Sequence, residues 1–152
     1  MSQQTSQTVS ILLVEDDKID QKSLQRSFKK MRISNPLQIA NDGVEAWDIL
    51  TQADGAPELS RPFMIILDIN MPRMNGIELL RKIRAHDTLK DTIVFMLTTS
   101  NDEKDKFEAF DCNVAGYMLK TDMDNSFMEA VELVENYWRV VEFPANVAVS
   151  AG

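Results

Sequence analysis

The sequence contains few of the residues that build disulfides, zinc sites or histidine-based catalysis. Among 152 residues there is one cysteine, Cys112, and one histidine, His86. A lone cysteine excludes an internal disulfide and fits a reducing cytoplasm. His86 lies in the polar segment RAHDTLKD, where nothing nearby in the sequence orients it as a base. We therefore expect His86 to be a surface loop residue and Cys112 to be a small packing residue.

Two further absences limit the partners of the chain. No apolar stretch reaches the ~18 residues needed to cross a membrane, and the first residues, MSQQTSQT, lack the features of a signal peptide. The net charge is −8, and the basic residues are scattered, the densest group being Lys29, Lys30 and Arg32. Nucleic-acid phosphates favour clustered basic residues. We therefore predict a cytoplasmic protein that binds neither DNA nor a membrane.

The chain contains four apolar runs that each close on a polar side chain. They are VSILLVED, FMIILDIN, TIVFMLTTS and GYMLK, and the polar residues at or just past their ends are Glu15, Asp16, Asp68, Thr98 and Lys120. Each run predicts a buried strand, and LQIA at 37–40 predicts a shorter one. Amphipathic segments between the runs predict helices.

The predicted helices alternate with the strands. Four of them have apolar residues at helical spacing, which we expect to face inward. In chain order these are Leu24, Phe28 and Met31; Val44, Trp47 and Leu50; Ile77, Leu80 and Ile83; and Phe127, Val131, Val134 and Trp138. A further short helix with an acidic start is expected over 101–110, between the third and the last of these. The last helix is expected to begin near Asp122 or Asp124. Continuously apolar strands separated by such helices indicate a doubly wound five-stranded parallel sheet, a flavodoxin-like (βα)5 α/β sandwich in one domain.

In a parallel sheet the carboxyl ends of the strands share one edge, so the five polar side chains should converge there. Two carboxylates ~4 Å apart repel by about 4 kcal/mol at an effective dielectric near 20. The three acids Glu15, Asp16 and Asp68 therefore need a dication or shifted pKa values. An all-oxygen site suits Mg²⁺ better than zinc. With Lys120 and Thr98 beside it, this cluster predicts phosphoryl transfer onto Asp68.

A purely structural interpretation makes the acids helix caps and turn residues. Capping accounts for one acid, for which Asp17 is the best candidate, but leaves the convergence of the other three unexplained.

At these residues the chain resembles the receiver domains of two-component response regulators. The matching residues are Glu15, Asp16, Asp68 in DINMP, Gly76, Thr98 in MLTTS, Tyr117 and Lys120, within residues 10–138. The resemblance implies a single-domain switch, not an ordinary enzyme, that accepts a phosphoryl group from a sensor histidine kinase on Asp68 and assists its own phosphorylation and dephosphorylation.

The resemblance also implies roles for individual residues. Asp16, Asp68 and the backbone carbonyl of Asn70 would bind Mg²⁺ directly, with Glu15 acting through water. Lys120 would contact the Asp68 carboxylate and the phosphoryl group. Thr98 and Tyr117 would form the conformational switch.

Two further segments make the resemblance specific to one group of receiver proteins. The long loop over 51–62 and the segment ENYWRVVEFP resemble stand-alone regulators paired with phytochrome-type histidine kinases (bacteriophytochromes). Residues 1–9 are expected to be a disordered tail, and no DNA-binding output domain is expected after residue 138. The apolar extension over 139–152 either folds back on its own domain or packs on a second copy. The resemblance implies the second arrangement, a homodimer through the last helix and this extension.

One residue departs from the family pattern. Thr121 follows Lys120 where the family has a proline joined by a cis bond, and a cis bond before a residue other than proline costs ~2.5 to 4 kcal/mol. The sequence leaves the isomer of the Lys120–Thr121 bond open.

Three other functions compete with this interpretation. A phosphohydrolase of the haloacid-dehalogenase type requires an acid two residues after the nucleophile, where Asn70 stands. A flavodoxin-like FMN-binding protein requires a phosphate loop rich in Ser, Thr and Gly where this chain has the acidic VEDDKID. A degenerate receiver that only binds proteins is disfavoured by the intact acids, Thr98 and Lys120.

Overall fold

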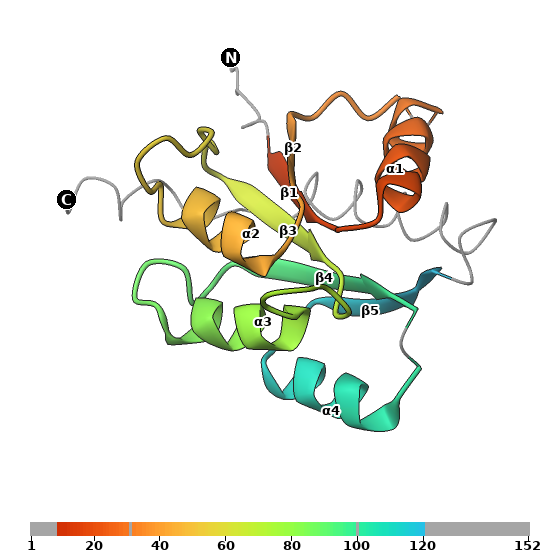
Figure 1. Ribbon diagram of the computed structural model, residues 1–152, viewed down its shortest axis with the longest axis vertical. Helices are drawn as coiled ribbons and strands as arrows, with labels where there is room; N and C mark the ends of the chain where they lie inside the picture. Colours follow the sequence, from red (N-terminus) through yellow and green to blue (C-terminus); the bar gives the residue numbers. More distant parts are fainter. Residues whose placement is uncertain (1–8, 31, 100, 121–152) are drawn as a thin grey trace, which may run out of the picture.

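The computed structural model describes residues 9–30, 32–99 and 101–120, in which five strands alternate with four helices (Figure 1). The elements are β1 (Ser10–Val14), α1 (Lys18–Lys30), β2 (Leu37–Ala40), α2 (Gly43–Leu50), β3 (Phe63–Leu67), α3 (Gly76–Ala85), β4 (Ile93–Thr98), α4 (Glu103–Asp111) and β5 (Gly116–Leu119). The predicted last helix, residues 1–8 of the predicted tail over 1–9, Met31, the Lys120–Thr121 bond and the extension over 139–152 lie outside the described residues. The tail prediction was wrong for Val9, which is 1% exposed and packs in the core. Within the described part of the chain, none of the helices is both long and apolar enough to cross a membrane.

The five strands form one parallel sheet in the order β2-β1-β3-β4-β5. The predicted doubly wound α/β fold is therefore confirmed. The chain builds the sheet outward from β1 to β2 and then resumes at β3 on the other side of β1. The strand order thus reverses between β1 and β3, and ligands of such sheets bind at the carboxyl ends of the strands at this point.

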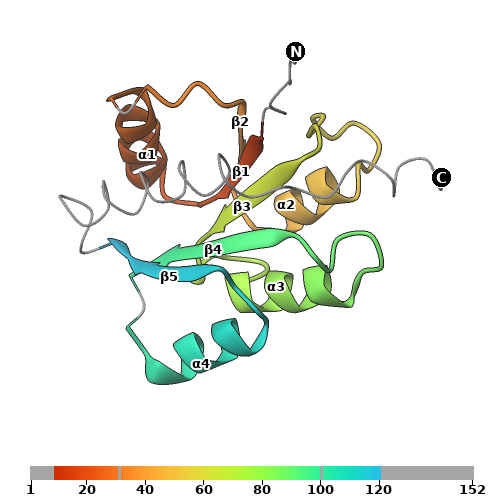
Figure 2. The ribbon, with the colours of Figure 1, turned by 180° about the vertical axis from the view of Figure 1, so that it is seen from behind.

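Helices cover both faces of the sheet (Figures 1 and 2). On one face α2, α3 and α4 pack against a core that includes Leu12, Ile65 and Met96. On the other, α1 packs through Leu24 and Phe28. All residues of β1 and β3 are buried. Because both central strands are covered on both sides, their continuous apolar runs have no exposed face, as the sequence predicted.

The inward face of α2 differs in part from the predicted one, of which only Leu50 is buried. Its buried residues are Gly43, Ala46, Ile49 and Leu50. A Cβ atom on Gly43 would lie 2.5 Å from the carbonyl oxygen of Met74. The absence of a side chain at Gly43 therefore lets α2 pack closely against the Met74 backbone. Val44 and Trp47 are only half-buried as a result.

Trp47 lies at the rim of the core, where two polar side chains cover its ring. Lys82 Nζ is 4.4 Å from the ring centroid, and the His86 ring meets it edge-on at 5.6 Å. His86 is the C-cap of α3 and half-buried, rather than the surface loop residue that its polar neighbours predicted.

Candidate functional site

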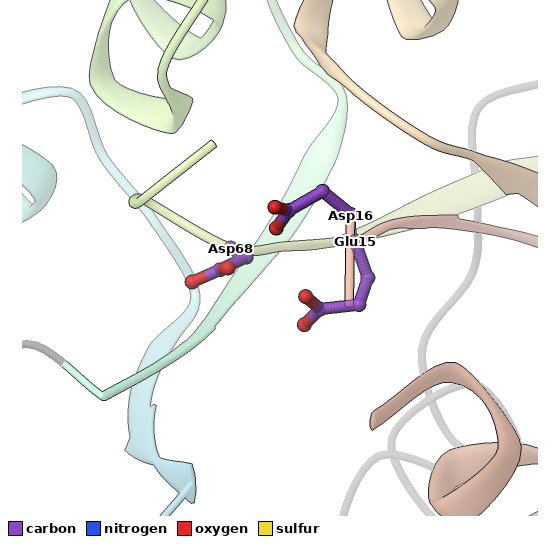
Figure 3. Close-up of side chains that lie close together, drawn as sticks. All are labelled: Glu15, Asp16 and Asp68. Carbon is purple, nitrogen blue, oxygen red and sulfur yellow. The ribbon is translucent and has the colours of Figure 1, made fainter. Parts of the chain in front are cut away.

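Three carboxylates meet at the carboxyl ends of β1 and β3. Val14 pairs with Leu67 in the sheet register, so Glu15 and Asp68 follow equivalent points of adjacent strands. Each of Glu15, Asp16 and Asp68 offers an oxygen within 4.8 Å of the others. Figure 3 shows Glu15 and Asp16 leaving the end of β1 on opposite sides, with both carboxylates turned toward the end of β3, where Asp68 lies. Glu15 and Asp68 are buried, at 1% and 4% exposure, whereas Asp16 is exposed.

The start of α1 uses a different acid. The Asp17 side chain accepts hydrogen bonds from the backbone N–H groups of Ile19 and Asp20, at 2.8 and 3.2 Å. This is an N-cap contact, and it satisfies backbone donors that the first helical turn leaves open. Asp17 therefore caps the helix, as predicted. Capping does not account for Glu15 and Asp16, which belong to the carboxylate cluster.

The ammonium group of Lys120 lies among several carboxylates. Lys120 Nζ is 2.5 Å from Glu15 Oε1, 2.8 Å from Asp20 Oδ2 and 3.3 Å from Asp68 Oδ2. Its side chain is only 8% exposed. Lys120 follows β5, so this contact joins the last described strand to β1, β3 and α1.

Asp20 was missed by the sequence analysis. It lies in the first turn of α1, four residues after Asp16. A helix that starts directly after β1 carries its first turn over the same sheet edge, and an acid there had a local explanation in the helix dipole. For this reason nothing in the sequence indicated that Asp20 contacts Lys120.

Burial changes the protonation of these groups. Desolvation raises the pKa of Glu15 from 4.5 to about 7, although contacts with Lys120 and the Asp17 backbone N–H act against the rise. Burial likewise raises the pKa of Asp68, against the effect of the Lys120 charge. For Lys120, burial favours the neutral amine, but hydrogen bonds to Asp20 and Glu15 outweigh it and raise the pKa. One ammonium group is therefore insufficient to compensate the carboxylates around it.

One oxygen of the central carboxylate has no partner. Asp68 Oδ1 is the single buried side-chain polar atom without a hydrogen-bond partner among the described residues. Such an atom is unfavourable unless a ligand or water completes it. Asp68 Oδ2 contacts Lys120, so Oδ1 is the oxygen of this carboxylate that is available to a ligand. The exposed Asp16 carboxylate lies nearby. The donor set consists of oxygen atoms only, which fits Mg²⁺ or a similar hard dication.

Gly76 holds the turn after Asp68 close to α3. A Cβ atom on Gly76 would lie 2.2 Å from the carbonyl oxygen of Asp68 and 2.8 Å from Cα of Ile69. The Gly76 backbone N–H also donates to the Ile69 carbonyl at 2.8 Å. A side chain at residue 76 would therefore push the Asp68–Ile69 backbone away. Asn70, predicted to offer its backbone carbonyl, follows in this turn and is exposed.

Thr98 and Tyr117 lie on one face of the sheet. Thr98 ends β4, is fully buried and pairs with Leu119, while Tyr117 of β5 pairs with Met96. Residues two apart in a strand share a face, so Thr98, Met96 and Tyr117 project to the same side. The Tyr117 ring is half-buried, with its centroid 6.3 Å from that of Phe110 on α4. The two predicted switch residues are thus diagonal neighbours on adjacent strands.

Comparisons with known proteins agree with this arrangement. A family model described as "Response regulator receiver domain" matches residues 11–132. Response regulator Rcp1 of Synechocystis sp. is 34% identical over 146 residues, covering 95% of this chain and 99% of that protein. The crystal structure of the Mn²⁺-bound form of Rcp1 has a TM-score of 0.79 at 34% identity, covering 90% of this chain and 99% of that one. The phosphorylated cyanobacterial phytochrome response regulator RcpA has a TM-score of 0.81 at 31% identity, covering 91% and 100%.

Proposed function

The chain belongs to the response regulator receiver domain family, and from this premise we propose that it is a switch in which Asp68 accepts a phosphoryl group from a sensor histidine kinase. The observation that carries the proposal is the state of the Asp68 carboxylate. It is buried between an ammonium group and two further acids, and its Oδ1 atom has no hydrogen-bond partner within the part of the chain that the structure describes. An oxygen without a donor keeps its lone pairs available for attack on phosphorus.

Asp68 and Lys120 perform complementary parts of the transfer. Oδ1 of Asp68 attacks the phosphorus atom in line, and the bond from phosphorus to the donor's leaving group breaks as the new P–O bond forms. Lys120 Nζ, 3.3 Å from Oδ2, is near enough to donate to an oxygen of the incoming phosphoryl group. Despite burial, the hydrogen bonds to Asp20 and Glu15 raise the pKa of Lys120, so the ammonium is charged when the phosphodonor arrives.

Mg²⁺ is the proposed cofactor of the transfer. Asp16, Asp68 and the Asn70 carbonyl would hold it, with Glu15 acting through water. When bound, Mg²⁺ neutralises charge on the acids and on phosphoryl oxygens. The Mn²⁺-bound form of the relative Rcp1 supports a divalent cation at this cluster. The protein's own contribution is to gather the acids at one edge and to bury two of them.

We expect Thr98 and Tyr117 to transmit phosphorylation of Asp68 to the protein surface. A phosphoryl group on Asp68 adds negative charge and acceptor oxygens, which draw the Thr98 hydroxyl toward it. Movement of Thr98 changes the packing available to Tyr117, its diagonal neighbour. Because Tyr117 contacts α4 through Phe110, the change reaches the surface formed by α4 and β5.

The partners are also proposals. The likeness to a phytochrome response regulator supports a phytochrome-type histidine kinase as the phosphodonor. We further propose a cytoplasmic homodimer through the last helix and the extension over 139–152, with slow dephosphorylation assisted by the protein itself.

Labelling with acetyl phosphate and Mg²⁺, followed by intact mass measurement, tests the chemistry. The wild type should gain the mass of one phosphoryl group, and Asp68→Asn should gain none because an amide is no nucleophile. Asp54→Asn, in the exposed loop before β3, is the matched control and should label normally. A labelled Asp68→Asn protein would refute the assignment of the phosphoacceptor.

A further inference from the structure

Asp20 is a charged residue of the site to which neither the family motif nor the proposed transfer gives a role. Its Oδ2 atom lies 2.8 Å from Lys120 Nζ, closer than the 3.3 Å that separates Nζ from Asp68 Oδ2. The Asp20 side chain is 26% exposed and the Lys120 side chain that it contacts is 8% exposed. The contact is therefore a partly buried ion pair, with the lysine side chain more buried than the aspartate.

The backbone of Asp20 is fixed independently of β5. Its N–H donates to the Asp17 cap at 3.2 Å, and α1 is held to the sheet by Leu24 and Phe28. Lys120, by contrast, follows the edge strand β5. Asp20 thus provides a stationary anion toward which the flexible lysine side chain is drawn.

The ammonium group has three N–H bonds and three carboxylate neighbours. The two nearer oxygens belong to Glu15 and Asp20, and the most distant belongs to Asp68. A phosphoryl group on Asp68 requires Lys120 to direct an N–H toward one of its oxygens. Every contact that holds Nζ toward α1 opposes that movement, and the charge of Asp20 also repels the incoming dianion.

We propose that Asp20 is a positioning residue that retains the Lys120 ammonium in the unphosphorylated state and so restrains phosphoryl transfer to Asp68. This inference rests on the proposed function. Asp20 exchanges no proton or electrons: the P–O bond to Asp68 forms, the bond from phosphorus to the leaving group breaks, and the leaving group keeps that electron pair. Asp20 acts only through the location of Nζ and through its own charge.

The size of the effect follows from the geometry. Asp20 Oδ2 and Asp68 Oδ2 contact the same nitrogen at 2.8 and 3.3 Å, so they are at most about 6 Å apart. The repulsion between two unit negative charges ~6 Å apart would slow phosphoryl transfer ~3-fold in water and ~100-fold at an effective dielectric near 20. Because Asp20 is partly exposed, we expect the lower end of this range.

The test is the rate of labelling by acetyl phosphate at saturating Mg²⁺. Asp20→Asn should be labelled about threefold to tenfold faster than the wild type. Asp20→Glu keeps the charge and should return the rate toward that of the wild type. Asp105→Asn, the same change at the third residue of α4, controls for the helix dipole and should leave the rate unchanged.

The sign of the change separates this role from a structural one. Damage to the fold would slow labelling, so a rate for Asp20→Asn that is equal to or below that of the wild type overturns the inference. A urea-unfolding cycle of Asp20→Asn with Lys120→Met supplies a readout without phosphorylation. Non-additive midpoint shifts support the contact, and additive ones overturn it.

The two proposals fail in different ways. A wild-type protein that takes up no label on Asp68 refutes the proposed function. Label on Asp68 without acceleration in Asp20→Asn refutes only the role of Asp20.

Discussion

Replacing Lys120 by methionine removes the ammonium group that contacts Glu15, Asp20 and Asp68. Methionine keeps much of the apolar stem but has no charge and no N–H donor. Glu15 and Asp68 are then left buried without the ammonium group that both contact. We expect the metal-free variant to lose much of its folding stability, because two desolvated carboxylates cannot both stay ionised.

The magnitude follows from the burial of the pair. Removing one partner of a buried ion pair costs ~3 to 5 kcal/mol. For a chain of this length each 1 kcal/mol lowers the Tm by about 2 to 4 °C, so the expected decrease is roughly 6 to 20 °C. The loss should shrink in acid, because protonated Glu15 and Asp68 no longer need the ammonium. It should also shrink with Mg²⁺, which supplies the missing positive charge.

Urea and thermal unfolding in EDTA and in Mg²⁺ measure this effect, with Lys106→Met as the matched control. Lys106 Nζ also pairs with a carboxylate at 3.3 Å, but Glu103 is 88% exposed. Exposed pairs contribute ~0 to 1 kcal/mol, so the control should barely change. If Lys120→Met loses no more stability than Lys106→Met, the electrostatic account of the site is wrong.

Two further predictions concern the same edge of the sheet. Gly76→Ala should lower stability by ~1 to 3 kcal/mol and slow labelling of Asp68, because its Cβ would meet the Asp68 carbonyl at 2.2 Å. Gly116→Ala, whose Cβ would meet the Phe95 ring at 3.0 Å, should cost less, and equal losses in urea unfolding would contradict this account. In EDTA, the raised pKa of Glu15 stabilises the fold fully below pH 4.5, and this stabilisation is lost as the pH rises to about 7. The increase in Tm caused by Mg²⁺ should therefore be larger at pH 8 than at pH 5, and an increase of the same size at both would argue against binding to ionised Glu15 and Asp68.

Local patterns were sufficient for the architecture and for the main members of the site. A short apolar run such as FMIIL between turn residues indicates a strand buried on both faces, and alternation with amphipathic helices indicates parallel strands. Parallel strands place their carboxyl ends together, so Glu15, Asp16 and Asp68 could be brought to one edge without coordinates. Asp17 as the helix cap followed from the same local rules.

Three-dimensional packing decided the features that depend on which atoms approach within a few ångströms. Trp47 was expected inward from its helical spacing, but the small residue Gly43 sets the close approach of α2 and leaves Trp47 at the rim. Asp20 looked like an ordinary first-turn acid until the end of β5 brought Lys120 to it, 100 residues along the chain. The raised pKa values of Glu15 and Asp68 arise from burial, which only the assembled sheet and its helices produce. Periodicity records which face of an element is apolar, whereas contacts between distant elements depend on how those elements pack.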